Sequence, residues 1–350
     1  MKQRTLAALV ALPLLLLLVV LAFTLPLPYA TYAPGLTVDV LGESEKGEEI
    51  IEVSGHEAYR DDGEVRMTTV FVSLPEADKR LPELLGAWLD DDEAVYPYEV
   101  VHPDGETVED SRREGAVDMV TSQDEAIAVA LTELGEEVEP AVGVAFVEDG
   151  TPADGALKVR DLFLEIDGKP IEKVEDVAAA VRAAGADDPV ELVVLRDGRR
   201  TTIEVTPKLK DGTPTIGITV GTFYRFPFQV SVDIDPAIGG PSAGLMFALA
   251  IYDTLTPGSL TGGETIAGTG TIDAEGRVGP IGGVQQKIAG ARADGAGLFL
   301  VPPDNCAEAL GAEAGDMRLV RAETMHDARL AVEAWAEDPN TELPSCEAAS

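Results

Sequence analysis

The clearest pattern along the chain is a long apolar run at its start. Leu6 to Leu25 is apolar at all but two positions, and the four residues before Thr5 include two basic side chains. A helix needs about 20 apolar residues to cross a bilayer, and basic residues before such a run favour a cytoplasmic N-terminus. A secretory signal peptide is the alternative, but its apolar core is usually shorter, about 7–15 residues. The pattern predicts an uncleaved membrane anchor and connector over residues 1–33, with the bulk of the chain extracellular.

Residues 34–120 alternate strand-like and turn-like pieces. Glu49 to Val53 and Thr68 to Leu74 are rich in residues that favour strands, and Leu81 to Leu89 predicts a short helix. Two histidines occur here without a second His or a Cys at metal-ligand spacing, so no metal site is expected. The sequence predicts a β-rich juxtamembrane region with no chemistry of its own.

A compact alternation of strands and helices follows over residues 124–210. Ser122 to Glu125 fits a capping box, which predicts that a helix starts there. Val142 to Val147 predicts a strand, Val174 to Ala184 an amphipathic helix, and Asp197-Gly198 the turn of a hairpin. This order of elements indicates a small domain with its own sheet.

The stretch VGVAFVEDGTPADGALKVRDLFLEIDGKPI in this domain resembles a bacterial PDZ domain. Such domains bind an extended peptide by adding it to a sheet edge beside a helix. The resemblance implies that a peptide lies along Val142, Gly143 and Val144, next to the predicted Val174 to Ala184 helix. A module that only holds two other domains apart is the alternative.

Two glycine-rich turns mark the last domain, residues 222–338, before a tail over residues 339–350. The first turn contains Ser242 and enters an apolar run, and the second turn leads into a predicted helix that contains Lys287. A serine hydroxyl is a poor nucleophile without a base. A lysine can be that base when burial in apolar surroundings lowers its pKa and leaves it neutral. The two turns therefore predict a nucleophile and its base, provided that they meet in the fold.

Three further positions complete the predicted site. A hydroxyl at Thr269 or Thr271 would hold the lysine amine in place. Backbone amides at the start of a helix, including that of Gly240 or its neighbours, would stabilise a developing oxyanion. A Ser–His–Asp triad through His326 is the weaker alternative. Although Ser242 formally fits Gly-x-Ser-x-Gly, the long series of strands and helices that surrounds that motif is missing here.

The stretches GGPSAGLMFALAIYDTLTPG, IAGTGTIDAEGRVGPIGGVQQKIAGA and GAGLFLVPPDNCAEA resemble the proteolytic domain of the Lon family of Ser–Lys peptidases. The resemblance implies that Ser242 is the nucleophile, Lys287 the base and Thr269 the residue that supports the lysine. Lon proteases often have aspartate three residues before the serine, where this chain has Gly239. That departure leaves the dyad intact and concerns how the site is held when no substrate is bound.

The order of a membrane span, a PDZ domain and a Lon-type domain resembles the membrane-anchored PDZ/Lon-like proteases of Gram-positive bacteria. We therefore expect an α+β multidomain fold with an N-terminal transmembrane helix, a small β-rich region, a PDZ domain and a Lon-type α+β proteolytic domain. The chain has no Gly-x-x-x-x-Gly-Lys-Ser/Thr motif, so no ATPase activity and no cofactor are expected.

The expected function is an ATP-independent, membrane-anchored serine endopeptidase. It would cleave unfolded or flexible protein segments outside the cytoplasmic membrane, with the PDZ domain selecting substrate or gating the site. A membrane-anchored PDZ adaptor with a non-cleaving Lon-like domain is the alternative. The sequence leaves open whether the chain acts as a monomer or a homo-oligomer.

Charge and cysteine content refine the expected partners. The formal net charge of −37 argues against nucleic-acid binding, which needs clustered Lys and Arg side chains. Partners are then protein or peptide substrates and the cytoplasmic membrane. The only two cysteines, Cys306 and Cys346, lie in the predicted extracellular part, where an oxidising environment permits a disulfide between them. Two free thiols are the alternative.

Overall fold

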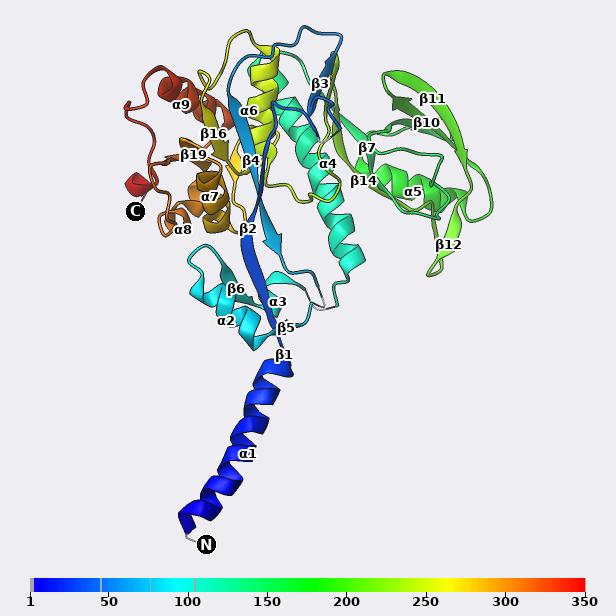
Figure 1. Ribbon diagram of the computed structural model, residues 1–350. Coiled ribbons are helices and arrows are strands. Elements are labelled where there is room, and N and C mark those ends of the chain that lie inside the picture. The colour runs from blue at the N-terminus through cyan, green and yellow to red at the C-terminus, as the bar shows by residue number, and fades with distance from the viewer. Residues whose placement is uncertain (1–2, 45, 76, 104, 350) are drawn as a thin grey trace.

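The computed structural model describes residues 3–44, 46–75, 77–103 and 105–349. Helix α1 (Gln3–Thr24) projects away from the body of the molecule (Figure 1), and its apolar side chains are exposed from Leu9 onward. Lys2, one of the two basic residues of the predicted N-terminal segment, lies outside the described residues. None of the helices in these ranges has both the length and the apolar character that crossing a membrane requires.

A six-stranded mixed sheet forms the centre of the body, in the order β20-β19-β16-β4-β2-β6. Its strands are β2 (Tyr29–Asp39), β4 (Glu64–Val72), β6 (Ala94–Pro97), β16 (Thr265–Gly268), β19 (Leu298–Val301) and β20 (Arg318–Arg321). β4 pairs antiparallel with β2 and parallel with β16. The N-terminal region is β-rich as predicted, yet its strands complete the sheet of the last domain, so residues 34–120 are not a self-contained unit.

Helices cover both faces of this sheet, and the alternation of side chains along the strands explains why. On β19, Leu298 and Leu300 pack with α6 (Gly244–Leu255), α4 (Val108–Glu133) and α9 (Met325–Glu337), whereas Phe299 and Val301 face α7 (Val284–Ala293) and α8 (Cys306–Ala309). Successive residues of a strand point to opposite faces. β19 is apolar at all four positions because both of its faces are covered.

Further strands and helices surround this central layer. β3 (Ile51–Ser54) pairs with β15 (Gln229–Val232), which immediately precedes the first glycine-rich turn. α2 forms over Leu81–Leu89, as predicted. The remaining short elements on this side of the molecule are β1 (Pro26–Leu27), β5 (Lys79–Arg80) and α3 (Tyr98–Val101). They lie near the base from which α1 projects (Figure 1).

The long helix α4 differs from the prediction. It begins at Val108, where Thr107 and Asp110 form the capping box, and it runs on without interruption through Ser122. The capping box predicted at Ser122 is therefore wrong, and that side chain lies buried in mid-helix. The first half of α4 is charged and contains Gly115, so its sequence lacks the apolar periodicity that identifies a helix.

The PDZ-like unit has a sheet in the order β11-β10-β8-β7-β14 and a core of its own. Its strands are β7 (Glu139–Val147), β8 (Leu162–Ile166), β10 (Val190–Arg196), β11 (Arg199–Val205) and β14 (Ile218–Arg225), with the short β9 (Lys169–Pro170) beside β8 and the hairpin β12 (Lys208–Lys210) and β13 (Thr213–Thr215) at one end. Helix α5 (Val174–Ala184) packs on the sheet through Val177 and Val181, and α4 contacts both β7 and β14. Helix α4 therefore connects the two sheets of the molecule.

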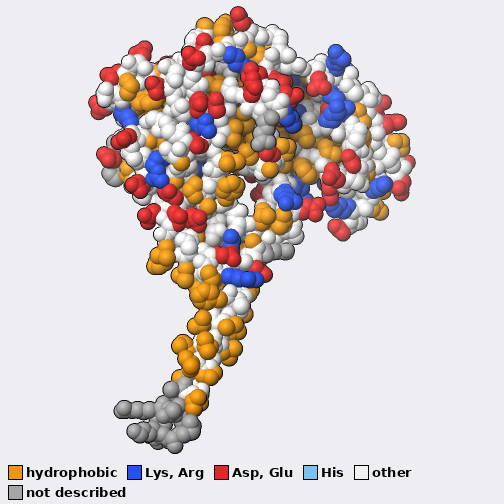
Figure 2. All heavy atoms as spheres, in the orientation of Figure 1, with side chains coloured by type: hydrophobic (Ala, Val, Ile, Leu, Met, Phe, Trp, Pro, Cys, Tyr) orange, Lys and Arg blue, Asp and Glu red, His pale blue; other side chains and the backbone are white. Residues whose placement is uncertain are grey.

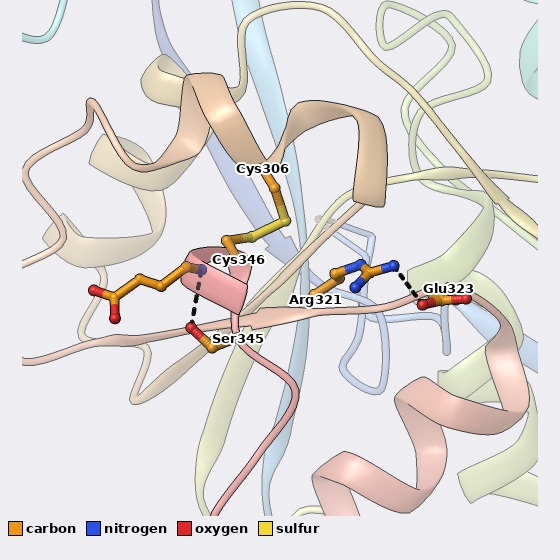
Figure 3. The surroundings of a disulfide bond; sticks show 6 residues. Cys306, Arg321, Glu323, Ser345 and Cys346 are labelled. Carbon is orange, nitrogen blue, oxygen red and sulfur yellow. Dashed lines mark hydrogen bonds and ion pairs between the residues drawn. A yellow bond between two sulfur atoms is a disulfide. The ribbon is translucent and has the colours of Figure 1, made fainter. Parts of the chain in front are cut away.

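Cys306 and Cys346 form a disulfide, as predicted. It joins the start of α8 to the short C-terminal helix η2 (Cys346–Ala349) (Figure 3). The backbone N–H of Arg321 also donates to the Pro344 carbonyl and holds the tail. The tail thus packs against the last domain. Acidic side chains are scattered over the rest of the visible surface, while apolar side chains cover α1 (Figure 2).

Candidate active site

The first glycine-rich turn runs from β15 to α6 and holds Ser242 just before the helix begins. Gly240 has φ +93°, a left-handed conformation that favours glycine. The Ser242 carbonyl accepts a hydrogen bond from the Gly270 N–H at 2.8 Å and another from Thr269 Oγ1 at 3.0 Å. These bonds fix the turn against the segment that follows β16.

Lys287 reaches this turn from α7. One side of α7 is buried through Val284, Lys287, Ile288 and Ala291, so the lysine points into the core and is only 2% exposed. Its Nζ lies 2.7 Å from Ser242 Oγ and 2.9 Å from Thr269 Oγ1. The structure therefore brings together the predicted serine, lysine and threonine from three separate segments.

The environment of Lys287 favours its neutral form. Burial lowers the pKa of Lys287 from 10.5 to about 7, because the charged ammonium loses its hydration. Within the described residues no carboxylate forms an ion pair with this amine, so nothing restores the charged state. A substantial fraction of the lysine is thus unprotonated at neutral pH and can accept a proton.

Residues that the sequence analysis did not identify support the lysine helix. Gly283, at the start of α7, lies so close to Val70 and Tyr32 of the N-terminal strands that a Cβ there would meet them at 2.8 and 3.1 Å. Asn305 accepts a bond from the Ile281 N–H and donates one to the Ile281 carbonyl, both at 2.9 Å. Asn305 lies within a segment that resembles Lon, but its side chain gave no signal of this role.

The structure places the other two predicted positions differently. Thr271 belongs to β17 (Thr271–Ile272), which pairs with β18 (Val278–Gly279), and its hydroxyl lies beside Gly279 rather than beside the lysine. The Gly240 N–H donates to the Gly115 carbonyl of α4 at 2.9 Å. The Gly240 amide is therefore occupied, and its predicted part in an oxyanion site does not fit this geometry.

The contact with α4 also explains Gly239, where Lon proteases often have aspartate. A Cβ at position 239 would lie 3.1 Å from the backbone of Gly115, closer than side chains normally approach. Two glycines thus let the helix and the turn pack backbone to backbone. A side chain at position 239 would push the turn away from α4.

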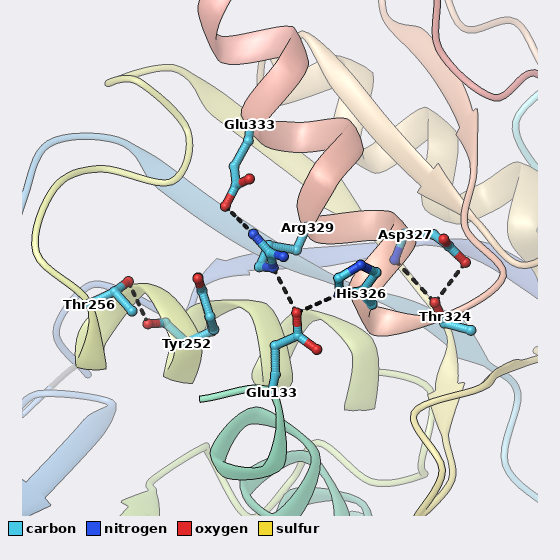
Figure 4. A network of polar contacts seen from close by, with 8 residues as sticks. All are labelled: Glu133, Tyr252, Thr256, Thr324, His326, Asp327, Arg329 and Glu333. Atoms are coloured by element: carbon cyan, nitrogen blue, oxygen red, sulfur yellow. Dashed lines mark hydrogen bonds and ion pairs between the residues drawn. The ribbon is translucent and has the colours of Figure 1, made fainter. Parts of the chain in front are cut away.

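The alternative through His326 is not supported by the geometry. His326 Nδ1 lies 2.7 Å from Glu133 Oε1 at the end of α4, and Arg329 Nε donates to the same oxygen (Figure 4). Asp327 accepts from the hydroxyl of Thr324, the residue that caps α9. This network joins α9 to α4, while the amine that lies beside Ser242 Oγ is that of Lys287.

The predicted peptide-binding strand is wrong for a simple reason of strand order. Val142, Gly143 and Val144 lie on β7, which has β8 on one side and β14 on the other. A peptide adds to a sheet edge, and the edge next to α5 is β14. A peptide that extends this sheet beside α5 would therefore have to pair with β14. In addition, the described residues contain no cluster of His, Cys, Asp and Glu that could hold a metal ion.

Comparison with known proteins agrees with this architecture. Residues 117–206 match the PDZ domain family, and residues 235–318 match the C-terminal proteolytic domain of Lon protease (S16). The chain carries a PDZ domain and a Lon-type proteolytic domain. The second match includes Ser242, Thr269 and Lys287, and the first begins within α4.

Individual relatives match these two domains only in part. The Lon protease of Desulforamulus reducens is 41% identical over 26% of this chain and 11% of its own length. A DegP-like periplasmic serine endoprotease of Pseudomonas fluorescens is 39% identical over 17% of this chain and 12% of its own. The PDZ domain of an SdrC-like protein of Listeria innocua is 27% identical, with a TM-score of 0.22, over 23% of this chain and 92% of that domain. This chain thus spans only a small part of the Lon protease and of the DegP-like endoprotease.

Proposed function

We propose that the protein is a serine endopeptidase in which Ser242 is the nucleophile and Lys287 its general base. The observation that carries this proposal is a buried amine, with no carboxylate partner among the described residues, 2.7 Å from a serine hydroxyl. A buried lysine whose pKa is about 7 is suited to proton transfer near neutral pH. The match of this region to the Lon proteolytic domain supports the same reaction class.

The hydrogen bonds around Lys287 indicate how the proton transfer would be directed. Thr269 donates its hydroxyl hydrogen to the Ser242 carbonyl, so its oxygen accepts from the lysine amine. A neutral amine has two N–H bonds and one lone pair, and the bond to Thr269 leaves that lone pair free to face the Ser242 hydroxyl. Thr269 thus orients the base.

The proposed reaction follows from this geometry. Ser242 Oγ attacks the scissile carbonyl carbon while Lys287 Nζ takes the hydroxyl proton. The tetrahedral intermediate collapses, the lysine returns the proton to the departing amine, and an acyl-enzyme remains. A water molecule then releases the acyl group by the same steps, with the lysine again accepting and returning a proton.

We further propose that cleavage needs no ATP and acts on unfolded or flexible segments. The chain has no P-loop motif that would bind a nucleotide. Without a motor to unfold proteins, substrates have to reach Ser242 as extended chain. The PDZ domain would select or present such segments at the edge strand β14.

Attachment to a membrane through α1 is also a proposal. Its support is the run of exposed apolar side chains from Leu9 to Leu25, which have no packing partner comparable to the core. If α1 spans the membrane with a cytoplasmic N-terminus, as the sequence pattern predicts, both domains would lie outside the cell. Flotation of the full chain with lipid vesicles, resistant to alkaline carbonate, is the expected result. Recovery in the soluble fraction would contradict it.

The test of the enzyme activity is cleavage of casein by the full chain in detergent, without ATP, beside Ser242→Ala. Because the alanine variant lacks only the hydroxyl, it should fold normally and show no cleavage above background. Cleavage by Ser242→Ala at the wild-type rate would contradict the assignment. Peptide binding without cleavage by the wild type would favour the adaptor function.

A further inference from the structure

Helix α4 holds the nucleophile turn through two hydrogen bonds. The Gly115 carbonyl accepts from the Gly240 N–H, and Ser122 Oγ donates to the Pro241 carbonyl, both at 2.9 Å. Ser122 is only 2% exposed, and the contact joins residues 119 positions apart in the sequence. A buried hydroxyl in mid-helix that bonds to another segment fixes the position of that segment.

The bond to Pro241 determines where the Ser242 amide points. The Pro241 C=O and the Ser242 N–H belong to one peptide group, and in a trans peptide they point in opposite directions. The described residues contain no cis peptide bond. When Ser122 fixes the direction of the carbonyl, it therefore fixes the direction of the Ser242 N–H as well.

The Ser242 N–H is one of the amides that this turn leaves free, together with those of Gly239 and Ala243. Pro241 has no N–H, and the Gly240 N–H is engaged by α4. No acceptor for the Ser242 N–H is found among the described residues. A free amide on the nucleophile itself can donate to the oxyanion that forms when Oγ attacks a carbonyl.

We propose that Ser122 is a positioning residue that orients the Ser242 N–H as the oxyanion donor. The inference rests on the proposed function and deepens it, because it identifies an oxyanion donor and the side chain that orients it. Removal of the Ser122 hydroxyl leaves the Pro241 carbonyl with only the Gly244 N–H at 3.4 Å. The Pro241–Ser242 peptide group can then rotate, and the Ser242 N–H no longer has one fixed direction.

The position of Ser122 also connects the active site to the PDZ domain. The next two residues of α4 are bound by that domain, since Arg160 donates to Gln123 and the Tyr224 N–H donates to Asp124. One turn of α4 thus contacts both the nucleophile turn and the PDZ domain. A cavity of about 1140 Å³ lies nearby, where α4, the PDZ residue Phe146 and the glycines of the nucleophile turn meet.

The experiment compares Ser122→Ala with wild type by peptide cleavage and by inhibition with a peptide boronic acid. The boron atom accepts a lone pair from Ser242 Oγ while the hydroxyl proton passes to Lys287, and the tetrahedral anion that forms places one oxygen in the oxyanion site. Loss of a whole oxyanion donor costs roughly 100-fold or more in kcat. A donor that is only misoriented should cost about 10-fold in kcat and in boronate affinity alike, with KM unchanged.

Thr132→Ala is a control for the loss of a hydroxyl from α4, because the exposed Thr132 bonds through Oγ1 only to the Ala128 carbonyl within the same helix. This control variant should keep the kcat and the boronate affinity of wild type. Ser122→Cys, which nearly keeps the shape but donates weakly, should lie between Ser122→Ala and wild type, and it serves if the alanine variant does not fold. Unchanged boronate affinity in Ser122→Ala or Ser122→Cys, or an equal loss in Thr132→Ala, would overturn the inference. Cleavage by Ser242→Ala would instead overturn the proposed function.

Discussion

The proteolytic domain and its junction with the PDZ domain each contain a buried ionisable group, but only the group at the junction has a charged partner among the described residues. In the proteolytic domain, Lys287 has only hydroxyl partners, and burial lowers its pKa to about 7. At the junction with the PDZ domain, burial raises the pKa of Asp124 to about 7 against the lowering effect of Arg160, 3.7 Å away, and of the Tyr224 amide. No carboxylate in the described part of the chain pairs with Lys287, whereas Arg160 and the Tyr224 amide partly compensate the negative charge of Asp124.

If Lys287 is the base, as we propose, the difference separates burial that serves chemistry from burial that serves assembly. A general base needs a free lone pair, so an ion-pair partner for Lys287 would keep it protonated and remove its function. Asp124 holds two elements together, and a cationic partner makes that contact stronger. The three predictions below change one group at a time and are ordered from the largest expected effect to the smallest.

Lys287→Met removes the base while keeping an unbranched side chain of similar length. Peptide cleavage should fall by about 1000-fold or more, because Ser242 loses the group that takes its proton. Thermal stability below about pH 7 should stay equal or rise, since a penalised buried charge disappears. The measurement is kcat/KM for a fluorogenic peptide, together with the unfolding midpoint from circular dichroism.

A folded Lys287→Met variant that still cleaves within tenfold of wild type would contradict the role of the lysine. Met246→Leu is a control for changing a buried unbranched side chain, because Met246 is buried in α6 and has no group that could accept a proton from Ser242. It should retain activity with a small change in stability.

Thr269→Val tests whether the lysine needs to be oriented as well as buried. Valine keeps the shape of threonine but removes the hydroxyl that bridges Lys287 and the Ser242 carbonyl. We expect kcat to fall by about 10- to 100-fold with little change in KM, because substrate binding does not use this hydroxyl. Steady-state kinetics on the same peptide provide the measurement.

Thr68→Val is the control for Thr269→Val. Thr68 is also buried and its hydroxyl donates to the Gly268 carbonyl, one residue away from Thr269, without contacting the lysine. If both variants lost activity equally, the effect would come from packing around β16 and not from orientation of the base.

Asp124→Asn should leave basal cleavage within about threefold of wild type and change the pH dependence of stability. The pKa of Asp124 is raised from 3.8 to about 7, so the folded state binds more protons than the unfolded state between these values. This group therefore makes stability fall as pH rises through that window, by at most about 1.4 kcal/mol per pH unit. Denaturant unfolding at about pH 5 and pH 7 should show a smaller fall in the variant.

Lys287 has the opposite sign in a different window. Its pKa is lowered from 10.5 to about 7, so the unfolded state binds more protons and stability rises with pH across that range.

Asp253→Asn is the control for Asp124→Asn. Burial raises the pKa of Asp253 to about 6, but this carboxylate accepts from the Leu260 N–H and lies far from the PDZ contact. If the free energy of unfolding of wild type and of Asp124→Asn depended on pH in the same way, the raised pKa of Asp124 would be contradicted.

Short motifs in the sequence are enough to predict that Ser242, Thr269 and Lys287 form one candidate site. Ser242 and Lys287 lie on or just after glycine-rich turns with a distinct local pattern, and Thr269 follows from the Lon resemblance. The long-range pairings could not be predicted in this way. β4 joins the catalytic sheet through β16, some 200 residues later, and a local pattern carries no information about such a partner.

The errors at the PDZ domain and at α4 have the same origin. The edge position of β14, rather than β7, depends on strand order, which follows from the whole domain. Ser122 shows the N-cap pattern that local chemistry favours, but packing against α6 continues the helix through it. Its hydroxyl is then available to the Pro241 carbonyl, a contact that no motif indicates.

The most direct test of the account is the pH dependence of kcat/KM for a fluorogenic peptide, without ATP, from about pH 5 to pH 9. Deprotonation of Lys287 should make the rate rise with pH and level off, with a midpoint near its pKa of about 7. The Ser242→Ala variant should be silent throughout. A profile without a rise near pH 7, or one that begins to rise only towards the ordinary lysine pKa of 10.5, would contradict a buried, neutral lysine as the base.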